Sequence, residues 1–142
     1  MLAAILAAAA VSLPTPPAAA VTVWSADILV WAENRPGGTR RAVLDGDLAK
    51  PGIVTYAFHM PDGAWFPARV HGSTARVFVL KGVLLLGQGA SGDRSKVLRV
   101  KAGEAALVPC GTVHYEGAEG ETVIVGVAEG PWTTRIVDAA GR

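Results

Sequence analysis

Short apolar runs separated by glycine and proline are the feature that most limits what this chain can fold into. The 142 residues include 17 glycines and 9 prolines, and no stretch keeps apolar residues at helical spacing for three turns. The run 53–60 is rich in β-branched and aromatic residues and lies between a Pro-Gly pair and a Pro-Asp-Gly triplet, as a strand between turns does. We expect strands at 53–60, 77–80, 83–86, 96–101, 105–108, 122–127 and 132–137.

The order of these runs predicts an all-β domain. Residues 77–80 and 83–86 lie on either side of Lys81-Gly82, so we expect them to form a hairpin. About nine or ten short strands at such regular intervals are typical of a sandwich or a barrel. The chain beyond residue 20 shows no internal repeat and no low-complexity segment.

Composition and charge exclude several classes of protein. The chain is 51% hydrophobic and 18% charged, with a formal net charge of +1. Thinly spread charge argues against a nucleic-acid partner or an anionic membrane surface, because both require a clustered basic patch. The large apolar fraction argues against disorder. The single cysteine, Cys110, excludes an internal disulfide and a zinc site built from several thiolates, and we interpret it as a turn residue.

The first 20 residues have the layout of a secretory signal peptide. An alanine-dominated apolar run is followed by prolines and then by Ala18, Ala19 and Ala20, the kind of small residues that precede a cleavage site. The run is too short for a stable membrane anchor. We therefore predict a signal peptide at 1–20, a single mature domain at 21–142, and a periplasmic or extracellular location. Signal peptides usually begin with a basic segment, which these residues lack. The alternatives to a signal peptide are an alanine-rich disordered tail and a misassigned start codon.

Two blocks of fixed spacing follow. In block 63–82, five residues separate Gly63 from Arg69, and one residue separates Arg69 from His71. Three residues then separate His71 from Ala75, and six separate Ala75 from Gly82.

In block 103–118, Gly103 is separated by five residues from Pro109. Gly111 follows after one residue, His114 after two more, and Ala118 after another three.

Together the two blocks resemble the two motifs of the cupin superfamily, in which glycine, His-x-His, glutamate and glycine are followed by glycine, Pro-x-Gly, histidine and asparagine. All intervals fit, and the glycines, the proline, His71 and His114 fit in identity. The resemblance covers at least residues 53–128 and is strongest to small single-domain bacterial cupins. It implies a jelly-roll β-barrel of two antiparallel sheets.

The departures from the family pattern concern its metal ligands. In cupins three histidines and one glutamate hold a divalent metal, but this chain has Arg69 in place of the first histidine and alanine in place of the glutamate. Arginine is always protonated and cannot serve as a ligand. The resemblance thus leaves His71 and His114 as metal ligands, with His59 as a candidate third. We expect no cofactor, with iron, manganese, zinc or nickel at these histidines as the alternative.

The three polar side chains that replace the full ligand set suggest a binding site. By the resemblance Arg69, His71 and His114 project into one barrel interior, where a buried arginine needs an anionic or hydrogen-bonding partner. No acidic residue occupies the neighbouring motif positions. We therefore expect Arg69 to bind a carboxylate or similar anion, with His71 and His114 orienting the ligand. The alternatives are an arginine that reaches the barrel mouth and two histidines of a filled core.

Three functions remain open from the sequence. The favoured one is a secreted or periplasmic cupin-domain protein that binds a small organic, anionic ligand without a strong metal site. The second is a metal-dependent dioxygenase- or isomerase-like enzyme with ligands rebuilt around His71 and His114. The third is a self-associating scaffold. We also expect a homodimer, with 21–24, 28–31 and Arg40-Arg41 at the interface, because cupins commonly pair through an N-terminal strand.

Overall fold

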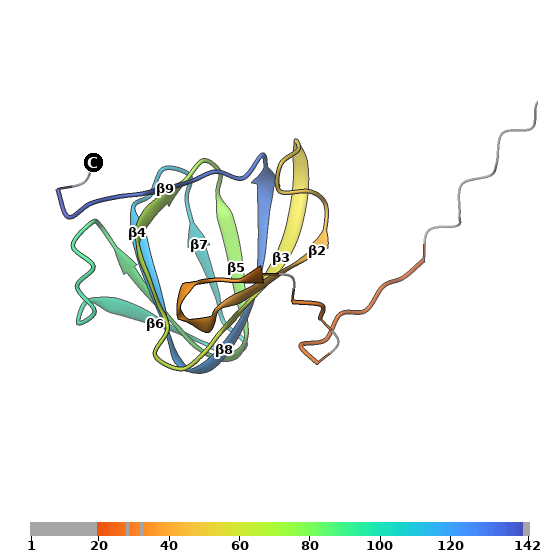
Figure 1. Ribbon diagram of the computed structural model, residues 1–142, viewed down its shortest axis with the longest axis horizontal. Coiled ribbons are helices and arrows are strands. Elements are labelled where there is room, and N and C mark those ends of the chain that lie inside the picture. Colours follow the sequence, from red (N-terminus) through yellow and green to blue (C-terminus); the bar gives the residue numbers. More distant parts are fainter. Residues whose placement is uncertain (1–19, 28, 32, 141–142) are drawn as a thin grey trace, which may run out of the picture.

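The computed structural model describes residues 20–27, 29–31 and 33–140, and the predicted signal peptide lies outside this range except for Ala20. The described chain is a barrel of antiparallel strands from which the N-terminal segment extends (Figure 1). Its elements are β1 (Glu33–Asn34), the 3₁₀ turn η1 (Pro36–Gly38), β2 (Arg40–Asp45), β3 (Gly52–Met60), β4 (Trp65–His71), β5 (Ala75–Gln88), β6 (Val97–Lys101), β7 (Ala105–Val108), β8 (His114–Gly130) and β9 (Thr134–Ile136).

Two antiparallel sheets share the long strands β5 and β8. The carboxyl half of β8 pairs with β3 and with the first half of β5, which also pairs with β7. The amino half of β8 pairs with β4 and with the second half of β5, which also pairs with β6. The strand orders are therefore β1-β2-β3-β8-β5-β7 and β9-β4-β8-β5-β6. The predicted all-β barrel of two antiparallel sheets is confirmed.

The hairpin expected at Lys81-Gly82 is wrong. Residues 77–80 and 83–86 belong to the single strand β5, whose register against β8 shifts on both sides of Lys81. Gly82 has φ +73°, and a Cβ there would lie 2.4 Å from the carbonyl oxygen of Glu121. Glycine thus permits a bulge against β8, and the strand passes from one sheet to the other without reversing.

Three strands, β1, β2 and β4, had no counterpart in the sequence prediction. Strand β2 carries charged residues at both ends, and β4 contains Pro67, which normally argues against a strand interior. The ladder between β4 and β8 is irregular between Phe66 and Arg69, so the structure accommodates the proline there. Strand β4 matters for the site because it carries Arg69 and His71.

Alternation along the central strands divides core from surface. On β5, Ala75, Val77 and Val79 are buried, whereas Arg76 and Phe78 are exposed. This is the period of two that a strand imposes on its side chains. The buried cluster between the sheets consists of Met60, Ala64, Ala75, Val77, Val79, Leu84, Val100, Val108, Ala118 and Ile124.

The N-terminal segment proposed for a subunit interface is largely solvent-exposed where it is described. Val21, Val23 and Val30 are the most accessible large apolar side chains of the described residues, and Trp24 is about half exposed. Trp31 instead lies edge-on to the His59 ring, and Arg40 approaches its indole ring. The homodimer stays a prediction. Among the described residues, no helix has the length and apolar character needed to span a membrane.

Candidate functional site

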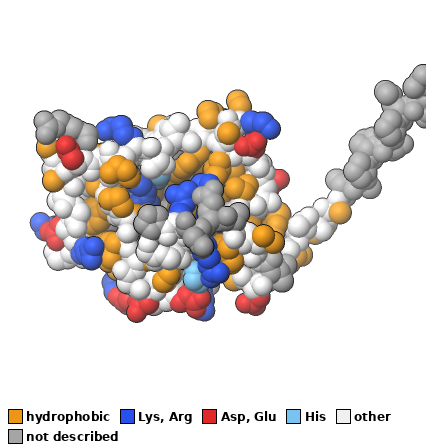
Figure 2. Space-filling model, viewed as in Figure 1, with side chains coloured by type: hydrophobic (Ala, Val, Ile, Leu, Met, Phe, Trp, Pro, Cys, Tyr) orange, Lys and Arg blue, Asp and Glu red, His pale blue; other side chains and the backbone are white. Residues whose placement is uncertain are grey.

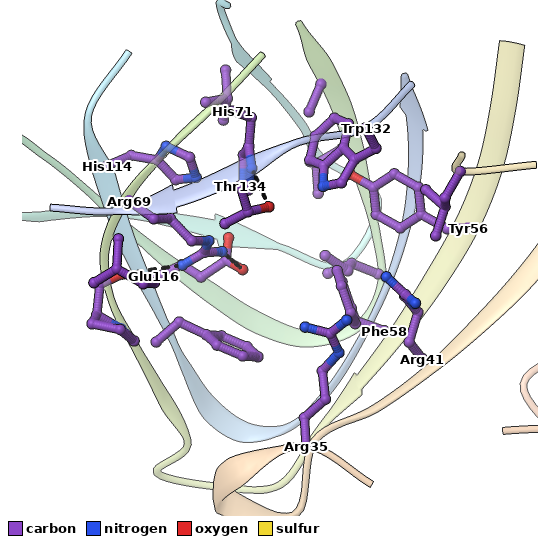
Figure 3. A pocket seen from close by; sticks show the side chains of 18 residues that line it. Arg35, Arg41, Tyr56, Phe58, Arg69, His71, His114, Glu116, Trp132 and Thr134 are labelled. Atoms are coloured by element: carbon purple, nitrogen blue, oxygen red, sulfur yellow. Dashed lines mark hydrogen bonds and ion pairs between the residues drawn. The ribbon is translucent and has the colours of Figure 1, made fainter. Parts of the chain in front are cut away.

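A cavity of about 150 Å³ lies inside the barrel. Its walls come from both sheets and from the segment before β2 (Figure 3). On the face drawn in Figure 2, basic and histidine atoms are visible among hydrophobic side chains near the centre. The lining residues are Arg35, Arg41, Leu48, Tyr56, Phe58, Phe66, Pro67, Arg69, His71, Ala75, Val77, Val108, His114, Glu116, Ile124, Trp132, Thr134 and Ile136.

The pairing of β4 with β8 brings the sequence-predicted residues together. Arg69 is the register partner of His114, and paired residues of antiparallel strands point to the same face. His71 follows Arg69 by two positions and shares that face. The rings of His71 and His114 lie 4.9 Å apart between centroids. Arg69, His71 and His114 therefore line one cavity, as expected.

Arg69 has an anionic partner within the protein, which corrects the premise that its charge lacks one. A terminal nitrogen of the Arg69 guanidinium donates to the carboxylate of Glu116, and the two side chains are only 9% and 7% exposed. The guanidinium also lies over the Phe66 ring, 4.9 Å from its centroid. The charge of Arg69 is thus balanced without a ligand.

Sequence reasoning missed Glu116 although a signal was available. Glu116 follows His114 by two positions, so both side chains point to the same face of β8. The two motifs assign no role to Glu116, because it lies between the motif positions His114 and Ala118. Buried glutamates are rare unless they are paired with a cation. A glutamate on the same strand face as His114 would therefore have indicated a cation inside the barrel.

Hydrogen bonds fix which ring nitrogen of each histidine is protonated. Nδ1 of His114 lies 3.0 Å from the carbonyl oxygen of Thr112, which can only accept, so Nδ1 carries the proton. Nδ1 of His71 lies 3.0 Å from the hydroxyl oxygen of Thr134, which can donate or accept, and 3.3 Å from the carbonyl oxygen of Thr133, which can only accept; we assign its proton to Nδ1 from the carbonyl contact. In both rings Nε2 is then an unprotonated acceptor.

Burial and the nearby guanidinium keep both imidazoles neutral. Burial lowers the pKa of His71 to about 4, and the positive charge of Arg69 and the neighbouring imidazole of His114 act in the same direction. Burial also lowers the pKa of His114, against the opposing effect of its hydrogen bond to Thr112. At neutral pH the histidines therefore offer hydrogen-bond acceptors and no positive charge.

His59, the candidate third metal ligand, lies outside this cavity. Tyr56 and Phe58 on β3 line the cavity, and His59, the next residue, points to the opposite face of the sheet. Its Nε2 is 2.7 Å from a carboxylate oxygen of Glu121, which also binds Lys81. These two partners lower the pKa of Glu121 to about 2. The structure thus does not bring His59 to His71 and His114.

Aromatic side chains form one wall of the cavity. Tyr56 contacts both Phe58 and Trp132, with ring centroids 5.4 and 5.8 Å apart, and Trp132 lies 4.3 Å from the His71 ring. Burial raises the pKa of Tyr56 well above its ordinary value. A wall of neutral rings suits the flat apolar body of a small molecule.

Two further arginines, not predicted as site residues, reach the cavity. Arg41 is the register partner of Phe58, which places both on the inner face of the sheet. Arg35, just before η1, lies with its guanidinium 5.8 Å from the centre of the Phe58 ring. In Figure 3 both guanidinium groups lie across the cavity from His71 and His114.

The residues around the histidine pair do not fit a divalent metal. Within the part of the chain that the structure describes, no three or more His, Cys, Asp or Glu side chains group as a metal site would need. Glu116 is the only carboxylate among the residues that line the cavity, and it is bound to the Arg69 cation. Two imidazoles beside a guanidinium lack the carboxylate that common iron and manganese sites include.

Comparison with known proteins identifies the family. The family described as "ChrR Cupin-like domain" matches residues 19–133. The chain belongs to this cupin family. The motif resemblance is thereby confirmed, together with the all-β barrel. No curated protein sequence matches the chain significantly.

Solved structures with the same fold include several cupins. The polyketide cyclase RemF from Streptomyces resistomycificus has a TM-score of 0.65 and 22% identity, over 82% of this chain and 85% of RemF. KdgF from Halomonas sp. has a TM-score of 0.60 and 17% identity, over 76% of this chain and 94% of KdgF.

A third structural relative is much longer than this cupin. Salicylate 1,2-dioxygenase from Pseudoaminobacter salicylatoxidans, solved with gentisate, has a TM-score of 0.60 and 15% identity over 72% of this chain. The match spans 30% of the dioxygenase. At such identities these likenesses establish the fold alone.

Proposed function

We propose that this cupin binds a small organic acid with a ring-sized apolar body inside the barrel, without a metal. The observation that carries the proposal is the lining of the cavity, which combines aromatic rings with guanidinium groups. Aromatic walls with a few convergent polar groups are typical of small-molecule sites. The absence of a suitable donor set beside His71 and His114 among the described residues supports binding without a metal.

Cavity volume limits the size of the ligand. Its volume of about 150 Å³ is close to that of an engineered apolar cavity that accepts benzene, and it is below the usual range for drug-sized ligands. A single ring with one or two small substituents matches this volume. Benzoate and cyclohexanecarboxylate are therefore suitable probes.

The distribution of charge favours an acid over a neutral molecule. Because Glu116 already balances Arg69, we assign the carboxylate of the ligand to Arg35 and Arg41. Both arginines take part in other interactions as well. A guanidinium has five N–H donors, so it can share them between such partners and a carboxylate.

The test compares acids with neutral analogues by thermal shift and calorimetry. Benzoate should raise the melting temperature more than nitrobenzene at the same concentration, because nitrobenzene has the shape of benzoate but neither its charge nor a hydrogen-bond donor, and only a ligand that prefers the folded state stabilises it. Replacing Arg41 by Gln should weaken benzoate binding roughly 10- to 100-fold, from the loss of a charge-assisted hydrogen bond. Arg76→Gln is the matched control, since Arg76 is exposed on the outer side of β5.

Two results would reject the proposal. If benzoate binds the Arg41→Gln and Arg76→Gln variants equally well, then Arg41 does not bind the carboxylate of the ligand. A stoichiometric metal that co-purifies with the protein and is lost in a His71→Ala, His114→Ala double variant would instead favour the metal-dependent enzyme. Export to the periplasm or exterior stays a separate prediction.

A further inference from the structure

We propose that the ligand carries a hydroxyl or amino group on the side opposite its carboxylate, and that the Nε2 atoms of His71 and His114 accept its hydrogen bonds. This inference rests on the proposed function and names the class of acid that the same cavity takes. A small ring with an acid at one end and a donor at the other fits this description, as in para-hydroxybenzoate.

The argument starts from the two protonated Nδ1 atoms. Nδ1 of His114 donates to the carbonyl oxygen of Thr112, and Nδ1 of His71 is assigned as the donor to the carbonyl oxygen of Thr133. The unprotonated Nε2 of each ring can only accept. Both rings line the cavity, and their centroids lie 4.9 Å apart.

The histidine side of the cavity is therefore rich in acceptors. Glu116, which shares this side, is an acceptor as well, and the Arg69 guanidinium is directed to it. A second carboxylate would meet two lone pairs here, whereas a hydroxyl or amine would supply the hydrogen that they lack.

The arrangement in space sets the geometry of the ligand. Figure 3 shows His71 and His114 on one side of the cavity and Arg35 and Arg41 on the other, with Trp132, Tyr56 and Phe58 along the wall between them. With room for about one ring, the two polar groups of the ligand must lie at opposite ends of that ring. A para arrangement satisfies this requirement.

The experiment measures the affinity of the full chain for para-hydroxybenzoate and para-fluorobenzoate by calorimetry, with a chelator present. The two acids share the ring and the carboxylate, but only the first has a donor. We expect para-hydroxybenzoate to bind roughly two- to tenfold more tightly, the contribution of one or two neutral hydrogen bonds. This preference should disappear in His71→Phe and His114→Phe variants. It should persist in His59→Phe, the matched control outside the cavity.

A measurement on the unmodified protein covers the case in which a variant does not fold. Nitrogen NMR of the imidazoles should show both Nε2 atoms unprotonated, and para-hydroxybenzoate should shift their resonances more than para-fluorobenzoate does. Equal shifts would overturn the inference.

The remaining outcomes separate this inference from the proposed function. If both acids bind equally, the proposed function stands and the inference is overturned. If neither acid binds, both are overturned. A preference that survives both His→Phe variants, or that is seen only when a divalent metal is added, also overturns the inference.

Discussion

Removal of the Glu116 charge should destabilise the protein strongly, because it leaves Arg69 buried without its counterion. The two side chains are only 9% and 7% exposed, so water replaces the lost partner poorly. Breaking a buried ion pair by removing one member costs about 3–5 kcal/mol. For a domain of this size that loss corresponds to a fall in melting temperature of roughly 10–20 °C.

The same strand offers a matched control. Glu119 on β8 binds Arg99, but these side chains are 50% and 49% exposed. Surface pairs of this kind contribute about 0–1 kcal/mol. We therefore expect Glu116→Gln to lower the midpoint of urea unfolding far more than Glu119→Gln. A double variant, Arg69→Met with Glu116→Met, should recover most of the loss, because a buried pair can be replaced by apolar side chains of similar volume.

Urea and thermal unfolding followed by circular dichroism would decide the matter. If Glu116→Gln costs no more than Glu119→Gln, then Arg69 is hydrated or has another partner, and the description of the site is wrong. If the double variant is as unstable as Glu116→Gln alone, the loss comes from packing and not from an uncompensated charge.

Three further predictions follow from the site and its walls. The pKa of His71 in the folded protein is lowered from 6.5 to about 4, so the contribution of neutral His71 to the free energy of unfolding should be complete above pH 6.5 and should be lost as the pH falls toward about 4. Urea titrations at each pH should show a smaller loss of stability in the His71→Gln variant. Gly126→Ala should lower the free energy of unfolding by about 1–3 kcal/mol, since a Cβ at Gly126 would lie 2.2 Å from the Tyr56 ring. Gly111→Ala is the comparison, because a Cβ there would meet nothing within 4 Å and only the positive φ opposes the substitution. Dialysis against a chelator should leave the melting temperature unchanged within about 1 °C, and a larger drop would indicate a structural metal.

Motif spacing predicted much of the site because strand geometry is local. Once 65–71 is a strand, alternation with period two places Arg69 and His71 on one face, and the resemblance to the cupin motifs implied that His114 lies opposite them. Alternation along β8 would also have found Glu116, two positions beyond His114.

Arg35 and Arg41 could not be found in this way. Their approach to the cavity depends on the pairing of β2 with β3, which sets Arg41 opposite Phe58, and on the η1 turn that places Arg35 over the same ring. Such contacts join segments that are distant in sequence, and no local periodicity reports them. The hairpin error at Gly82 has a related cause, because a glycine that allows a bulge between sheets looks in sequence like one that allows a turn.

The sequence by itself determined an all-β domain, because turn residues and strand alternation are properties of neighbouring positions, and its resemblance to the cupin motifs implied that two histidines and an arginine lie inside the barrel. Only the tertiary structure decided that Arg69 is neutralised by Glu116, that His59 faces Glu121 outside the cavity, and that Arg35 and Arg41 lie opposite the histidines. The physical reason is that charge balance and cavity shape depend on which strands pair and in what register, and register is fixed by packing across the whole domain.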